Sequence, residues 1–123
     1  MITHYTYWNE DFGYRFSISP ACLKRAPQWL EHAEFPPLSP RIAIANSRIA
    51  VQRMLAEVQP FEPKFDACAL KGDGASWHYV VSWFVPDLED CATDWSAISI
   101  PVLFDGSTPD PLKFKYEDRF EVY

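Results

Sequence analysis

The chain has 123 residues, a formal net charge of −6 and an aromatic content of 16%. This length predicts a single domain that buries enough surface for its own core. The basic residues are scattered and form no patch, which argues against nucleic-acid binding. No apolar run approaches the roughly 18 residues of a membrane span. The N-terminus lacks the regions of a signal peptide, so we expect a cytoplasmic protein, with export behind a trimmed signal as the alternative.

The N-terminal part of the chain predicts a strand and a short helix. Residues 5–8 are aromatic and suit a short strand or a packed arm. Apolar and polar side chains alternate over residues 14–18, which is the period of a half-buried strand. Residues 21–32 suit a short helix that is interrupted by a proline and begins at Ser19 or Pro20.

The strongest helix pattern covers residues 39–59. Ser39 suits the N-cap, and Pro40 suits the first helical position because its missing N–H costs nothing there. Pro60 cannot continue a helix, and no glycine interrupts the segment.

The apolar residues of this helix lie on two opposite sides. At about 100° per residue, one side gathers Ile44, Val51, Met54, Leu55 and Val58, and the other gathers Ile42, Ala45, Ile49 and Ala56. A helix that lies on a sheet needs only one apolar side. The second side therefore needs a cover of its own, either the N-terminal arm, which we favour, or another subunit.

Three further strands are expected, at residues 65–71, 77–85 and 97–104. Gly72 and Gly74 suit the turn of a hairpin. The second strand is apolar on both faces and should be central in its sheet; one face carries Trp77, Tyr79, Val81, Trp83 and Val85. Pro101 places the third strand at an edge or at a bulge.

The predicted fold class is α+β, with one long helix packed on an antiparallel sheet of four to five strands and with an N-terminal arm and a C-terminal tail. We expect one domain over residues 1–123. Residues 1–35 form the N-terminal strand and short helix, residues 36–106 the helix and antiparallel strands, and residues 107–123 a tail that adds a strand or wraps the surface.

The order of helix, strand, glycine-rich hairpin and aromatic strand over residues 36–85 resembles small PepSY-like domains, and cystatin-like domains share this plan. The matching segments are residues 43–58, 65–70 and 77–81. The resemblance implies a non-catalytic binding or inhibitory module, and it assigns no functional residue.

No group of side chains shows a catalytic, cofactor-binding or metal-binding pattern. His78 has no nucleophile or acid near it in the sequence, so we expect a hydrogen-bonded or half-exposed strand histidine. The acidic loop at residues 87–94 lacks the spacing of a calcium loop. Cys22, Cys68 and Cys91 form no metal-site spacing. We expect three free thiols with Cys68 in the core, or one disulfide and one free thiol in an exported protein.

These features predict a non-enzymatic protein-interaction or inhibitor-like module that binds another protein or a second copy of itself. The candidate interaction surface combines the second side of the helix with the aromatic face of the central strand, namely Ile42, Ala45, Ile49, Trp77, Tyr79 and Trp83. The alternative is a small-ligand-binding domain with a pocket between the helix and a curved sheet.

Overall fold

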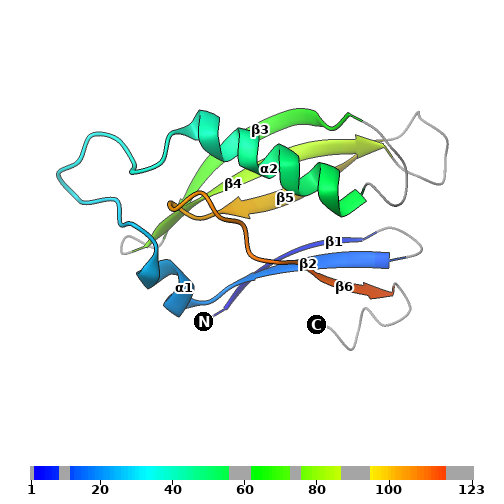
Figure 1. Cartoon of the computed structure of the whole chain (residues 1–123), viewed down its shortest axis with the longest axis horizontal. Helices are drawn as coiled ribbons and strands as arrows, with labels where there is room; N and C mark the ends of the chain where they lie inside the picture. Colours follow the sequence, from blue (N-terminus) through cyan, green and yellow to red (C-terminus); the bar gives the residue numbers. More distant parts are fainter. Residues whose placement is uncertain (1, 9–11, 56–61, 73–75, 87–94, 116–123) are drawn as a thin grey trace.

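The computed structural model describes residues 2–8, 12–55, 62–72, 76–86 and 95–115. The chain is α+β, as predicted. Its elements are β1 (Thr3–Trp8), β2 (Phe12–Ile18), α1 (Pro20–Arg25), α2 (Pro40–Leu55), β3 (Lys64–Gly72), β4 (Trp77–Pro86), β5 (Trp95–Val102) and β6 (Leu112–Lys115). The strands form two antiparallel sheets of three strands each, in the orders β1-β2-β6 and β3-β4-β5 (Figure 1).

The prediction of a single sheet of four to five strands is wrong. The N-terminal segment and the tail leave the main sheet and build the second one, in which β2 pairs with both β1 and β6. Gly13 of β2 stands opposite Phe114 of β6, and a Cβ at Gly13 would lie only 2.5 Å from the Phe114 ring. Because Gly13 has no side chain, the Phe114 ring can lie directly against β2. The pairing of β2 with β6 joins the N-terminal and C-terminal parts of the chain.

The order of the main sheet follows the sequence prediction. β4 is central, and β5 occupies one edge, where Pro101 needs no ladder donor. β1 contacts β5 and brings the two sheets together (Figure 1). β3 forms the opposite edge, with an irregular register between Phe65 and Ala67.

Helix α2 begins at Pro40, as expected, after the Ser39 cap. The backbone N–H of Ile42 donates to the Ser39 carbonyl at 3.1 Å and to its hydroxyl at 3.4 Å. The predicted last turn of the helix, residues 56–59, lies outside the described residues.

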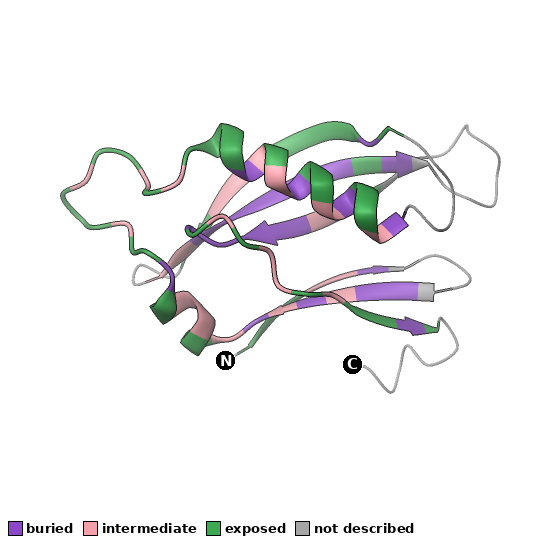
Figure 2. Cartoon of the chain, viewed as in Figure 1, coloured by how far each residue is buried: buried purple, intermediate pink, exposed green. Residues whose placement is uncertain are grey.

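One row of small and branched side chains faces the sheet from α2. The buried row is Ala43, Ser47, Val51 and Leu55, and the outward side of the helix is exposed (Figure 2). Ile44 and Met54 were also expected to be buried on this side of the helix, but they lie at its margins and are only half-buried. The helix is rotated toward Ala43 and Ser47 because their small side chains leave room for the large aromatic residues of β4.

Trp83 of β4 occupies the space beside the small side chains of α2. Its side chain is fully buried, and its indole N–H donates to the Ser47 hydroxyl at 2.8 Å. Ser47 in turn donates to the Ile44 carbonyl at 2.9 Å. Phe65 meets the indole edge-on at 5.6 Å, and the Arg48 guanidinium lies 5.1 Å from its centroid. The indole is thus enclosed by α2 on one side and by β3 on another.

Replacing Ser47 by Ala should destabilise the fold by about 1–3 kcal/mol, because it leaves the indole N–H buried without an acceptor. Urea unfolding measures the change. In a Trp83→Phe background, which has no indole N–H, the same replacement should cost clearly less. An equal cost in both backgrounds would contradict a role for the hydrogen bond.

Candidate functional site

The outward side of α2 is an open apolar surface. Ile42 is 49% exposed, Ile49 is 51% exposed, and Ala45 between them is also exposed. The expectation that the N-terminal arm covers these three residues is wrong, because the arm is used in the β1-β2-β6 sheet. Within the described part of the chain, the row of isoleucines therefore has no full cover.

The aromatic half of the candidate surface is closed. Tyr79 and Trp83 are buried beneath α2, so no partner can reach them without opening the core. Trp77 is half-buried and packs edge-on against Trp29 at 5.3 Å. The structure therefore does not unite the six predicted residues in one surface, and Ile42, Ala45 and Ile49 remain.

Three arginines accompany the exposed isoleucines, a feature that the sequence analysis missed. Arg41, Arg48 and Arg53 are all exposed, and α2 contains no acidic residue. None of the three forms an ion pair with a described residue. The helical period could have revealed these arginines in the sequence. At about 100° per residue, they fall on the flanks of the isoleucine row.

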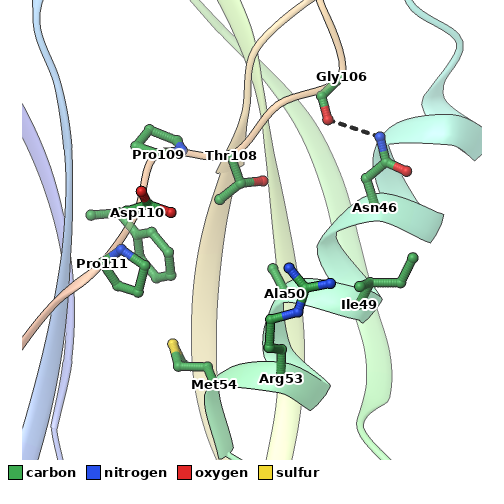
Figure 3. A pocket seen from close by; sticks show the side chains of 11 residues that line it. Asn46, Ile49, Ala50, Arg53, Met54, Gly106, Thr108, Pro109, Asp110 and Pro111 are labelled. Carbon is green, nitrogen blue, oxygen red and sulfur yellow. Dashed lines mark hydrogen bonds between the residues drawn. The ribbon is translucent and has the colours of Figure 1, made fainter.

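A pocket of about 260 Å³ lies between α2 and the segment that joins β5 to β6 (Figure 3). The Asn46 amide donates to the Gly106 carbonyl at 2.8 Å and ties this segment to the helix. The Arg53 side chain points from α2 toward Thr108, whose hydroxyl oxygen is buried and has no hydrogen-bond partner among the described residues. Asp110 also lines the pocket.

A second cavity, of about 520 Å³, lies between the proline-rich lead into α2 and the β3 side of the main sheet. Its walls are mostly apolar and consist of residues 35–40 together with Cys68, Leu70 and Tyr79. The Tyr79 hydroxyl donates to the Leu38 carbonyl at 2.7 Å and holds the lead in place. The Tyr79 hydroxyl is thereby paired, and the Ser39 hydroxyl, which also lines the cavity, accepts from the Ile42 N–H.

His78 is a buried, hydrogen-bonded strand residue. Its Nε2 lies 2.8 Å from the Tyr5 hydroxyl of β1, while its Nδ1 is buried without a partner among the described residues. Burial lowers the pKa of His78, and the positive charge of Lys71 lowers it further. The hydrogen-bonded alternative of the sequence prediction is confirmed.

Cys22 and Cys68 are both free thiols. Hydrogen bonds from Ser19 and then Arg25 lower the pKa of the Cys22 thiol. Burial raises the pKa of Cys68, which is half-buried in β3 rather than in the core. Cys91 and the acidic loop at residues 87–94 lie outside the described residues.

Among the residues that the structure describes, no three His, Cys, Asp or Glu side chains converge as a metal site, and no helix is long and apolar enough to cross a membrane. No family model matches this chain, and no curated protein or solved structure matches it either. The PepSY-like or cystatin-like resemblance therefore stays a prediction.

Acid should weaken the fold through His78. Its pKa is below the ordinary value of 6.5 in the folded state, so the unfolded chain binds the proton more readily, and stability falls as the pH drops below about 6.5. Replacing His78 by Gln should flatten the pH dependence of urea unfolding between about pH 7.5 and 5.5. The matched control is His32→Gln at an exposed position, and an equal flattening there would contradict the assignment.

Proposed function

We propose that this chain is a non-enzymatic protein-interaction module that binds a partner through the outward side of α2. The observation that carries the proposal is the row of half-exposed isoleucines at Ile42 and Ile49, which the rest of the described chain leaves open. Two exposed β-branched residues on one helix side are costly to leave in water, and contact with a partner would recover part of that free energy.

The spacing of the row favours a helical partner. Ile42, Ala45 and Ile49 follow one another at steps of three and four residues. This is the spacing of a seam between two packed helices. A partner helix with its own apolar stripe would fit along α2.

The charge of α2 favours a partner that differs from this chain. In a pairing of α2 with a second copy, Arg41, Arg48 and Arg53 would find no carboxylate on the other helix, because the described α2 has no acidic residue. Like charges across an interface oppose association, whereas acidic flanks on a partner helix would complement them. We therefore propose a heteromeric contact with an acidic, apolar-striped helix rather than the homodimer.

A small-ligand site is the second candidate function. It is supported by the Thr108 hydroxyl, which is buried without a hydrogen-bond partner among the described residues and faces Arg53 in the pocket beside α2 (Figure 3). The volume of about 260 Å³ lies below the roughly 300–1,000 Å³ of most ligand pockets. A compact molecule with an anionic group is the class that would fit.

The interaction surface can be tested by placing a photo-crosslinking amino acid at position 49, with position 112 as the control. Leu112 is nearly as exposed as Ile49, at 49% against 51%, but lies in β6. We expect a protein that crosslinks only from position 49. Once purified, it should bind the Ile42→Gln/Ile49→Gln variant at least about tenfold more weakly than wild type, and Leu112→Gln should bind normally.

Two results would contradict the interaction proposal. One is a purified partner that binds the double isoleucine variant as tightly as wild type. The other is a wild-type homodimer in sedimentation experiments that the isoleucine replacements dissociate, because it would assign the surface to self-association.

The small-ligand candidate predicts that inorganic phosphate or a small carboxylate raises the melting temperature of the wild-type protein. Arg53→Gln should abolish the increase because it removes the positive charge from the pocket. Arg41→Gln, which changes the same charge outside the pocket, is the control. A shift that is equal in all three proteins, or absent from all, would reject this candidate.

A further inference from the structure

The pocket beside α2 carries two opposite charges. Of its described lining residues, only Arg53 and Asp110 are charged. Arg53 belongs to α2, and Asp110 lies in the segment that joins β5 to β6. Both side chains are exposed, and neither forms an ion pair with a described residue. The pocket therefore offers one positive and one negative group to the same ligand.

Other charged residues of the same two segments and of β6 do not alter this balance. Asp105 is outside the pocket lining, and its carboxylate already accepts from the Ser107 backbone N–H at 2.9 Å and from the Ser107 hydroxyl at 2.6 Å. Arg48 and Lys113 also do not line the pocket, and each lies over an aromatic ring, at 5.1 Å and 5.9 Å from its centroid. The charge pattern inside the pocket is thus set by Arg53 and Asp110.

The Thr108 hydroxyl lies between these two charges. Its oxygen is buried and has no hydrogen-bond partner among the described residues. Figure 3 shows Thr108 between Asp110 and the guanidinium end of Arg53. A buried hydroxyl without a partner costs free energy, and a polar ligand atom in the pocket would remove that cost.

An apolar wall completes the pocket. Phe16, Met54 and Pro111 line it, and Phe16 is only 2% exposed. The volume of about 260 Å³ leaves room for a short side chain beside the charged groups. Two charges, a hydroxyl and an apolar surface therefore meet within the space of one small molecule.

This combination disfavours simpler ligands. An anion such as phosphate would meet Arg53 but would also face the Asp110 carboxylate, and an organic cation would face Arg53. A zwitterion presents a group of opposite sign to each side chain. The α-amino acids carry a carboxylate and an ammonium group on one carbon atom, whereas a peptide separates its two charged ends by at least one peptide unit.

We propose that the pocket beside α2 binds a free α-amino acid with an apolar side chain. Its carboxylate would accept from Arg53 and from the Thr108 hydroxyl, and its ammonium group would donate to Asp110. Its side chain would pack against Phe16 and Met54. This proposal rests on the small-ligand candidate above and narrows the ligand from an anion to a zwitterion.

Matched ligands test the charge pattern. We expect at least one of L-valine, L-leucine and L-methionine to shift the backbone amide resonances of Gly106 and Thr108 in an NMR titration of the isotope-labelled full chain. The resonance of Ala69 in β3 is the control and should not move. The tightest ligand is then compared with its deaminated and decarboxylated analogues, which for L-leucine are isocaproate and isoamylamine. Each analogue should bind at least about tenfold more weakly.

Matched variants test the same pattern from the protein side. Arg53→Gln and Asp110→Asn should each raise the Kd of the amino acid at least about tenfold. Arg41→Gln in α2 and Asp66→Asn in β3 remove the same charges outside the pocket and should leave the Kd unchanged. Asp110→Asn should lower the Kd of the deaminated analogue, because it removes the repulsion between the two carboxylates.

Thr108→Val separates binding from folding. The replacement removes the buried hydroxyl and nearly keeps the shape of the side chain, so the melting temperature of the ligand-free protein should stay the same or rise. The Kd of the amino acid should nevertheless rise at least about threefold. A fall in the melting temperature together with an unchanged Kd would contradict the role given to Thr108.

The outcomes distinguish this proposal from the candidate on which it rests. If the deaminated analogue binds as tightly as the amino acid and Asp110→Asn changes neither Kd, the amino-acid proposal is overturned, while the small-ligand candidate stands. If phosphate, the amino acids and their analogues all fail to shift the resonances of Gly106 and Thr108, both are overturned. Weaker binding to Arg53→Gln and Asp110→Asn alone, with normal binding to the two control variants, supports the proposal.

Discussion

The contact between Trp83 and Ser47 fixes the position of α2 on the main sheet. Burial of a tryptophan removes about 150–250 Å² from water, which at about 25 cal/mol per Å² contributes about 4–6 kcal/mol. That burial requires a small residue on the helix and an acceptor for the indole N–H, and Ser47 provides both at 2.8 Å. Because Ser47 faces the sheet, Ile42 and Ile49 must face outward, so the open side of α2 is a geometric consequence of this one contact.

The second sheet explains why nothing in the described chain closes that open side. Strands β1 and β2, which belong to the segment expected to cover the helix, pair with each other, and β2 also pairs with β6, so that this sheet packs beside the main sheet. This sheet is joined to the rest by the Tyr14 hydroxyl, which donates to the Met54 carbonyl at 2.8 Å, and by the Tyr5–His78 hydrogen bond. Both contacts lie at the margin of the core. The arm therefore stabilises one flank of α2 and leaves the outward side to solvent.

The sequence patterns predicted those structural features that depend on residues close together in the chain. The start of α2 at Pro40 and the central place of β4 follow from caps, prolines and alternation that lie within a few residues. The pairing of Gly13 with Phe114 joins opposite ends of the chain, and no local pattern specifies it. The candidate site divides in the same way. The helical period of the isoleucine row reveals it in the sequence. The burial of Tyr79 and Trp83, in contrast, depends on which side of α2 faces β4. Ser47 determines that side, and a pattern of apolar residues does not include it.

The uneven distribution of charge separates the outward side of α2 from the rest of the chain. The chain as a whole is acidic, yet the described α2 carries three arginines and no acidic residue. An acidic protein repels acidic partners at long range, so a local basic surface acts mainly on orientation and specificity once the partner is close. The isoleucines on α2 would then supply most of the affinity.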